Sequence, residues 1–412
     1  MRHSGGCCYS VPMDRLKFHD ILYNDVQLGP YPDHLLKRVA APTNQIPGPV
    51  ERPSERDNVY GKSLMGDFGE DTQREFKRLS ERYPIVAAIH DLQMHIAAYG
   101  RRRTPVAAKK APLPDDPRMR SRHLKALGYY LGADQVRIGP LAPEAVYRED
   151  VRQRPIEAPF KYAIVFACRK DPRAMSASNG WDDIVSPLSH QVYQKLAVIT
   201  EVTTGYLHRL GIDAVPSYFR SYVTLMPRLV LDAGLGEASR MGIVLNPFFG
   251  CHCKYGAVLT DLELEVDGYV DFGLQDYCRK CTICAQQCPT QAIPRGGQIL
   301  YNGYYTWKLD TKACSDFGIF NQEGTVCGRC TKVCPWNRTD LGPHDFAEWD
   351  GDLEWLHQTV DDQRARNQAN GYVDPREYTD KWWFRLEDRD GEIFTPTGKN
   401  AQKLCRDYPV QE

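Results

Sequence analysis

The feature that most constrains this chain is a run of four closely spaced cysteines, Cys278-x2-Cys281-x2-Cys284-x3-Cys288, which ends in Pro289. At these spacings the first three sulfurs of a tight loop can hold one iron–sulfur cube. The fourth cysteine then turns away to ligate a second cube. The run therefore predicts a pair of 4Fe–4S clusters, and the second cluster requires a second set of cysteines elsewhere in the chain.

That second set lies downstream, where Cys327-x2-Cys330-x3-Cys334 is again followed by proline and Cys314 stands further upstream. This module resembles the two-cluster ferredoxins. We expect one cluster on Cys278, Cys281, Cys284 and Cys334, and the other on Cys288, Cys314, Cys327 and Cys330. The alternative is two zinc knuckles. Zinc sites usually pair two CxxC units and do not run three such steps into Cys-Pro, so the spacing favours iron–sulfur clusters.

Length and charge limit the rest of the chain. With 412 residues it exceeds one ordinary domain of ~150 residues. Its 52 basic and 53 acidic residues nearly cancel, which argues against a protein that binds nucleic acid by bulk charge. No apolar run approaches the ~18 residues that a membrane helix needs. The first residues show neither an apolar export core nor a twin-arginine pair, so we expect a cytoplasmic protein with no membrane span.

Four segments are expected along the chain. An N-terminal arm and helical region (1–118) precedes the core (119–270), the ferredoxin-like cluster domain (271–340) and a C-terminal wrapping segment (341–412). The last segment is expected to cover the body because its apolar side chains Trp382, Trp383 and Phe384 need burial.

Local patterns predict helices alternating with strands in the core, an α/β (α+β) fold. A helical stretch over 69–98 should break or kink at Pro84. Another helix should end near Gly132, and a long one should run from Ser189 to Leu210 and stop at Gly211. Short strands are expected at DQVRIGPL, YAIVFAC, IDAVPS, YVTLMP and KYGAVLTDLEL.

Two clusters in a chain of this length imply a redox site that receives their electrons. The sequence contains neither a dinucleotide fingerprint nor a Walker-type loop. The ordered segments LGADQVRIGPL, KYAIVFAC, LGIDAVPS, DAGLGEASRMGIVLNPFFG and KYGAVLTDLEL, followed by the cysteine module, resemble the cobalamin-dependent reductive dehalogenases. The resemblance extends over roughly 120–340. It implies a nitroreductase-like core that binds base-off cobalamin, with the cluster module beside it. Without the leader of exported members or the appended reductase domain of some catabolic ones, the chain is expected to receive its electrons from a ferredoxin, a flavodoxin or a reductase.

The resemblance also assigns catalytic roles. Tyr193 matches the family's proton-donating tyrosine, Lys254 its cationic partner, and Ser189 a small hydroxyl residue of the same pocket. A free phenol has a pKa near ~10 and is a poor acid–base group at neutral pH. An ammonium within ~4–6 Å favours the phenolate, so we expect Lys254 to lower the pKa of Tyr193.

Cobalamin contacts are expected from loops that match cofactor-facing segments of the family, at Gly242, Asn246, Thr290, Ala292 and Trp307. None of the 11 histidines lies in the Asp-x-His-x-x-Gly run of His-on cobalamin sites. The CxC pair that flanks His252 fits poorly around a single ion and is expected to line or support the pocket; its members are Cys251 and Cys253. The remaining cysteines are expected to be ordinary thiols: Cys7, Cys8, Cys168 and Cys405.

Two other functions stay open. Epoxyqueuosine reductase combines the same cofactors in a similar core but acts on tRNA, which calls for a basic surface, and it uses a carboxylate where this chain offers Tyr193. A pure electron-transfer protein would hold the clusters and no corrinoid. We favour the dehalogenase, with a small organohalide as substrate and no nucleic-acid partner.

Overall fold

A computed structural model describes residues 28–31, 33, 36–79, 84–102, 104–176, 185–320, 326–337, 365 and 387–394. Expectations for Cys7, Cys8, Cys405 and the aromatic residues 382–384 lie outside these ranges. Within them, no helix combines the length and the apolar character that a bilayer span requires.

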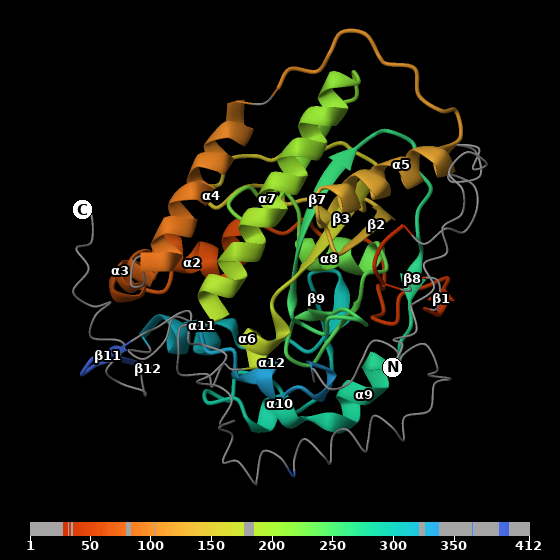
Figure 1. Cartoon of the computed structure of the whole chain (residues 1–412). Helices are drawn as coiled ribbons and strands as arrows, with labels where there is room; N and C mark the ends of the chain where they lie inside the picture. The colour runs from red at the N-terminus through yellow and green to blue at the C-terminus, as the bar shows by residue number, and fades with distance from the viewer. Residues whose placement is uncertain are drawn as a thin grey trace, which may run out of the picture.

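The core is a four-stranded antiparallel sheet in the order β2-β3-β7-β4 (Figure 1). Its strands are β2 (Gln135–Pro140), β3 (Tyr162–Arg169), β7 (Cys253–Thr260) and β4 (Ala214–Ser217). All four were predicted. Both faces of β3 are buried, which explains its continuous apolar run. Because every pairing is antiparallel, the core is α+β.

Helices cover both faces of this sheet. On one face α5 (Pro117–Tyr130) and the long α7 (Val185–Arg209) pack on alternate residues of β3, including Ile164 and Phe166. On the other face α8 (Met226–Asp232) packs with Ala163 and Val165. Figure 1 shows α4 (Pro84–Arg102) running beside α7. The expected break or kink at Pro84 stays a prediction, because residues 80–83 between α3 (Glu70–Leu79) and α4 lie outside the described ranges.

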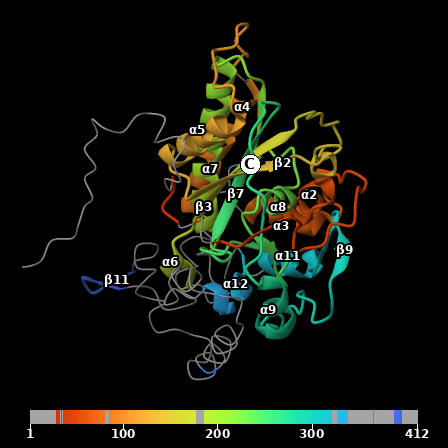
Figure 2. The same ribbon diagram turned by 90° about the vertical axis from the view of Figure 1, so that its right-hand side faces the viewer.

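The cysteine module lies below the sheet in Figures 1 and 2, next to the start of α7. Its helices are α9 (Leu274–Cys281), α10 (Ile283–Gln286), α11 (Thr311–Phe320) and α12 (Arg329–Val333). Short elements complete the described fold: α2 (Val59–Met65), α6 (Pro172–Ser176), β1 (Arg38–Val39), β5 (Glu237–Ala238), β6 (Val244–Leu245), β8 (Tyr269–Val270), β9 (Ile299–Tyr301), β10 (Tyr304–Thr306), β11 (Glu387–Arg389) and β12 (Glu392–Phe394).

One strand prediction is wrong. The segment YVTLMP makes only a single bridge, between Thr224 and Val146, and the chain then enters α8 at Met226. Pro227 explains the difference, because proline fixes a helical φ and its missing N–H costs nothing in the first helical turn. This turn from β4 into α8 carries several side chains of the site described next.

Candidate functional site

The candidate catalytic pair lies where α7 crosses β7. Tyr193 projects from α7, and Lys254 is the second residue of β7, opposite Cys168 of β3. The Lys254 Nζ lies over the Tyr193 ring, 4.9 Å from its centroid. A cation at this distance is attracted by the negative face of the aromatic ring. Both side chains remain partly exposed, so a small molecule can reach them.

Three further side chains surround Tyr193. The Phe219 ring stacks on it with centroids 4.4 Å apart and planes 15° from parallel, and the His190 ring meets it edge-on at 6.5 Å. The Tyr222 hydroxyl donates a hydrogen bond to the Tyr193 oxygen. Sequence reasoning missed Phe219 and Tyr222, because both lie in the irregular turn between β4 and α8.

The expected lowering of the Tyr193 pKa is wrong. Burial raises the pKa of Tyr193 to about 12, and the hydrogen bond from Tyr222 offsets only part of that rise. Loss of hydration penalises the phenolate, and Lys254 meets the face of the ring. At neutral pH Tyr193 therefore carries its proton, as a proton donor must. Burial lowers the pKa of Lys254, whose acidic neighbours are the Cys253 and Cys251 thiols.

Ser189 lies one helical turn before Tyr193, on the same side of α7, and is partly exposed. The structure therefore brings the three predicted catalytic residues onto one side of the site. No hydrogen bond of the Ser189 hydroxyl occurs within the described residues.

The cluster cysteines lie near one another, and Cys284 of the first expected set also acts on Cys330 of the second, so the division into two sets stays a prediction. The pKa of the Cys334 thiol is raised by burial and by the neighbouring thiols Cys281, Cys284 and Cys278. In the other set, burial and the thiols Cys327 and Cys288 raise the pKa of Cys314 to about 11. Cysteines must lose their protons to bind metal, and crowded, buried thiols do so readily only when the metal's positive charge is present. The donor set thus fits two clusters. Among the described residues, no three side chains converge on a single-ion site.

Cys251 lies between the cluster cysteines and the catalytic pair. Its sulfur accepts a hydrogen bond from Asn337 Nδ2 at 2.9 Å, and its charge would act on Cys330 and Cys334 as well as on Lys254. Lys170 is also buried here, and burial lowers its pKa to about 8. These groups connect the two parts of the site, in agreement with the expected supporting role of the CxC pair.

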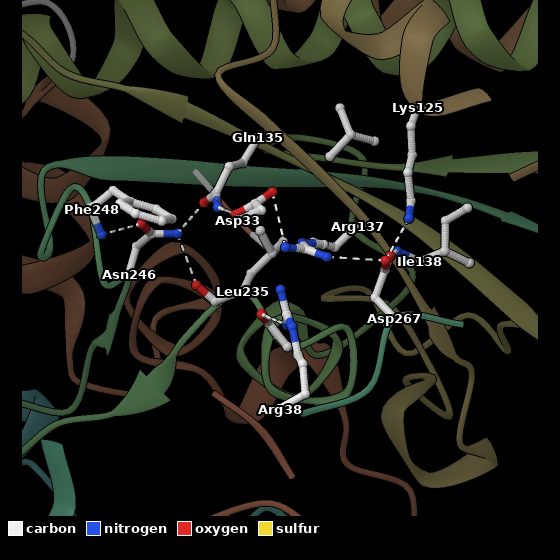
Figure 3. A network of polar contacts seen from close by, with 12 residues as sticks. Asp33, Arg38, Lys125, Gln135, Arg137, Ile138, Leu235, Asn246, Phe248 and Asp267 are labelled. Atoms are coloured by element: carbon white, nitrogen blue, oxygen red, sulfur yellow. Dashed lines mark hydrogen bonds and ion pairs between the residues drawn. The ribbon is translucent and has the colours of Figure 1, made fainter. Parts of the chain in front are cut away.

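The predicted cobalamin neighbour Asn246 uses its side chain within the protein. Its Nδ2 donates to Gln135 Oε1 at 2.5 Å and to the Leu235 carbonyl at 2.8 Å, and its Oδ1 accepts from the backbone N–H groups of Phe248 and Phe249 (Figure 3). Asn246 therefore holds the loop after β6 in place, and its side-chain amide is already hydrogen-bonded within the protein.

The other predicted neighbours also offer mainly backbone and apolar surface. Trp307 is buried and donates to the Gly296 carbonyl, Thr290 Oγ1 lies 3.5 Å from the Cys288 sulfur, and Ala292 is buried. Gly242 has a φ of 72°, and a Cβ there would lie 3.2 Å from Leu309. Backbone and apolar surface of this kind suits a large ring that is held without side-chain ligands. Contact between these loops and cobalamin stays a prediction.

Comparison with known proteins agrees with this geometry. Residues 277–337 match the model of a 4Fe-4S double cluster binding domain. The tetrachloroethene reductive dehalogenase of Sulfurospirillum multivorans is 31% identical over 214 residues, which are 49% of this chain and 39% of that protein. The enzyme of the same name from Dehalobacter restrictus is 33% identical over 198 residues, or 45% and 35% of the two chains.

The structure of the catabolic reductive dehalogenase NpRdhA, in complex with 3-bromo-4-hydroxybenzoic acid, superposes with a TM-score of 0.79. It is 32% identical and covers 91% of this chain and 54% of that one. In sequence and in fold, this chain is therefore similar to the reductive dehalogenases. It spans only about half of that solved dehalogenase, and less of the curated relatives.

The family likeness reaches further than the sequence suggested. We expected it over roughly 120–340, but a match to 91% of the chain must extend into the flanking segments as well. The fold shared with that structure is therefore not limited to the core and the cysteine module. The expected fold class, a mixed α and β core with a two-cluster module, is confirmed by the superposition and the cluster-domain match.

Proposed function

We propose that this chain catalyses reductive dehalogenation, in which an organohalide, two electrons and one proton give the hydrogenated product and halide. The observation that carries the proposal is the superposition on NpRdhA together with Tyr193 and Lys254 side by side where α7 crosses β7. Base-off cobalamin, when bound, would supply the electrons that break the carbon–halogen bond. The eight cluster cysteines would hold the two 4Fe–4S clusters that carry electrons inward from a separate donor protein.

Tyr193 is proposed as the proton donor. Its raised pKa keeps the hydroxyl protonated until the substrate carbon gains electrons, and general acids of this kind contribute ~10²–10⁴-fold to a rate. The Tyr222 hydroxyl would stabilise the phenolate that remains, because it already donates to that oxygen. Lys254 would add positive charge beside the phenolate and the departing halide.

An epoxyqueuosine reductase is the second candidate, since the enzyme of Pseudomonas aeruginosa is 28% identical over 158 residues, or 34% of this chain. The protein should be purified without oxygen, reconstituted with iron, sulfide and cobalamin, and reduced with methyl viologen. It should then be offered halogenated phenols, alkyl halides and epoxyqueuosine-containing tRNA. Halide release is expected. Turnover on the tRNA alone would replace the proposal with the second candidate. Protein that takes up iron but no corrinoid would point to an electron carrier.

A further inference from the structure

Arg240 lies in the loop between β5 and β6, and its side chain is buried against the cysteine module. Its Nε donates to the Cys278 carbonyl at 2.8 Å, and its Nη1 donates to the Pro294 and Gly296 carbonyls at 2.9 and 3.0 Å. These hydrogen bonds join the cluster helix α9 to the loop that precedes β9. The guanidinium carbon also lies over the Trp307 ring, 4.8 Å from its centroid. The guanidinium is therefore held in one position from several sides.

The hydrogen bonds of Arg240 differ from those of other buried arginines in this chain. Arg228 donates to the Asp232 carboxylate at 2.8 Å, and Arg137 lies 3.1 Å from the Asp267 carboxylate. The hydrogen-bond partners of Arg240 in the described residues are main-chain carbonyls, which satisfy its N–H groups but leave its positive charge in place. A buried charge is costly unless opposite charge lies close to it. The negative charge near Arg240 is therefore of interest.

Two cluster cysteines lie within reach of the charge of Arg240. Burial raises the pKa of the Cys278 thiol, while a hydrogen bond from the Arg240 backbone and the charge of its guanidinium act in the opposite direction. Burial and the Cys281 thiol raise the pKa of Cys284 to about 12, and the same guanidinium charge opposes that rise. All three cysteines belong to the first expected set. The fixed cation thus favours negative charge on the sulfurs of this set.

A fixed cation beside a 4Fe–4S cluster affects how readily the cluster is reduced. Each electron that enters the cluster adds one negative charge, and a nearby cation stabilises that charge. Net charge, hydrogen bonds to the sulfurs and solvent exposure set the reduction potentials of such clusters. A buried cation acts more strongly than an exposed one, because the dielectric constant of the interior is low and salt does not screen it. Arg240 combines burial with a fixed position next to the cluster cysteines.

We propose that Arg240 is a positioning residue that raises the reduction potential of the 4Fe–4S cluster held by Cys278 and Cys284. In the step that it favours, the reduced donor loses one electron and the cluster gains it, and no bond forms or breaks. With the cation in place, a larger share of this cluster is reduced at a given potential. The inference needs the clusters, which the match of residues 277–337 supports, and does not need the organohalide chemistry.

The test is a redox titration of the full chain, reconstituted without oxygen with iron, sulfide and cobalamin. Dithionite is the reductant, and electron paramagnetic resonance records the reduced clusters. In Arg240→Gln, which removes the charge, the ratio of reduced to oxidised cluster at a fixed potential should fall about tenfold, or ~59 mV for one electron. The fall should be confined to the signal that Cys281→Ala removes, because that cysteine belongs to the same expected set. An equal change in both cluster signals would overturn the inference.

Two further variants separate the charge of Arg240 from its hydrogen bonds. Arg240→Lys keeps the charge but loses the forked contacts with the carbonyls, so the potential should stay close to that of wild type. Arg279→Gln is the matched control, because the Arg279 side chain is 58% exposed and pairs with Asp276, and neither signal should shift.

The outcomes distinguish an electrostatic role from a structural one. An unchanged potential in Arg240→Gln, or an equal fall in Arg240→Gln and Arg240→Lys, would make Arg240 a structural residue. If Arg240→Gln binds too little iron for a titration, Arg240→Lys is sufficient for the test. A wild-type potential in that variant supports the inference, and a lowered potential overturns it.

Discussion

The Lys254 ammonium lies over the face of the Tyr193 ring, 4.9 Å from its centroid, while the Tyr222 hydroxyl donates to the Tyr193 oxygen. The two neighbours thus act on different parts of Tyr193. Tyr222 stabilises charge on the oxygen, and Lys254 holds the ring and adds positive charge to the site. Burial outweighs the hydrogen bond from Tyr222 and keeps the phenol protonated.

Replacement of Tyr193 by phenylalanine should remove most of the dehalogenase activity and leave the cofactors in place. The ring keeps its stacking partner Phe219, so the local packing survives, and only the proton donor is lost. We expect kcat to fall by ~10²–10⁴-fold. Halide release measures the activity, and the visible spectrum reports cobalamin and clusters. Wild-type turnover in this variant would remove Tyr193 from the mechanism.

Replacement of Tyr222 by phenylalanine should slow the reaction less. The Tyr193 phenolate would lose its hydrogen-bond donor, so the pKa of Tyr193 should rise further. A drop in kcat of about tenfold is expected from the loss of one hydrogen bond to a charged oxygen. The double variant with Tyr193→Phe should be no slower than Tyr193→Phe alone. An additional loss in the double variant would show that Tyr222 acts independently of Tyr193.

The alkaline limb of the pH profile should report on Lys254. Burial lowers the pKa of Lys254 below its usual 10.5, whereas that of Tyr193 is about 12, so the lysine loses its charge first as the pH rises. Activity that needs the ammonium is present below the Lys254 pKa and is lost above it. In Lys254→Arg the charge persists, and the decline in kcat/KM should move to higher pH. The same alkaline limb in both proteins would exclude this role of Lys254.

The sequence was sufficient to predict the sheet and the catalytic pair, for different reasons. Strand β3 is a nearly continuous apolar run, which burial on both faces explains, and β7 contains the apolar segment Gly256–Leu259. The catalytic roles of Tyr193 and Lys254 were predicted from the family resemblance alone, since a tyrosine on a helix or a lysine near a strand does not by itself indicate catalysis.

The turn between β4 and α8 shows what could not be predicted. Its residues 218–225 have no periodicity, so nothing indicated that Phe219 and Tyr222 would contact Tyr193. The YVTLMP segment contains β-branched and aromatic residues that favour a strand, but Pro227 starts a helix. The direction in which the Tyr193 pKa shifts could not be predicted either, because desolvation depends on the packing of residues far apart in the sequence.

The stability of the protein should fall as the pH rises from about 4.5 to about 7 through the ionisation of Glu237. Its carboxyl accepts from the N–H groups of Phe272 and Leu274, just where the first cluster helix begins. Burial raises its pKa from 4.5 to about 7 in the folded state. The folded protein therefore holds the proton more tightly than the unfolded chain, so this contribution is full below pH 4.5 and is lost through pH 7.

The size of that contribution is on the order of 3 kcal/mol at most, and Glu237→Gln should remove it. Chemical denaturation of both proteins at several pH values measures the difference. Toward neutral pH, the free energy of unfolding of the variant should increasingly exceed that of the wild type. A constant gap would mean that Glu237 does not titrate in this range.

The two cysteine sets should lose their clusters separately. Cys281→Ala removes a thiol from the set that contains Cys334, and Cys330→Ala removes one from the set that contains Cys314. Because each 4Fe–4S cluster needs four thiolates, either variant should drop from about eight bound iron atoms to about four, with loss of a different signal in the electron paramagnetic resonance spectrum. Cys168→Ala, which changes a buried thiol of β3 outside both sets, should keep all the iron. Zinc in place of iron in the anaerobically prepared wild type would contradict the assignment of both sets.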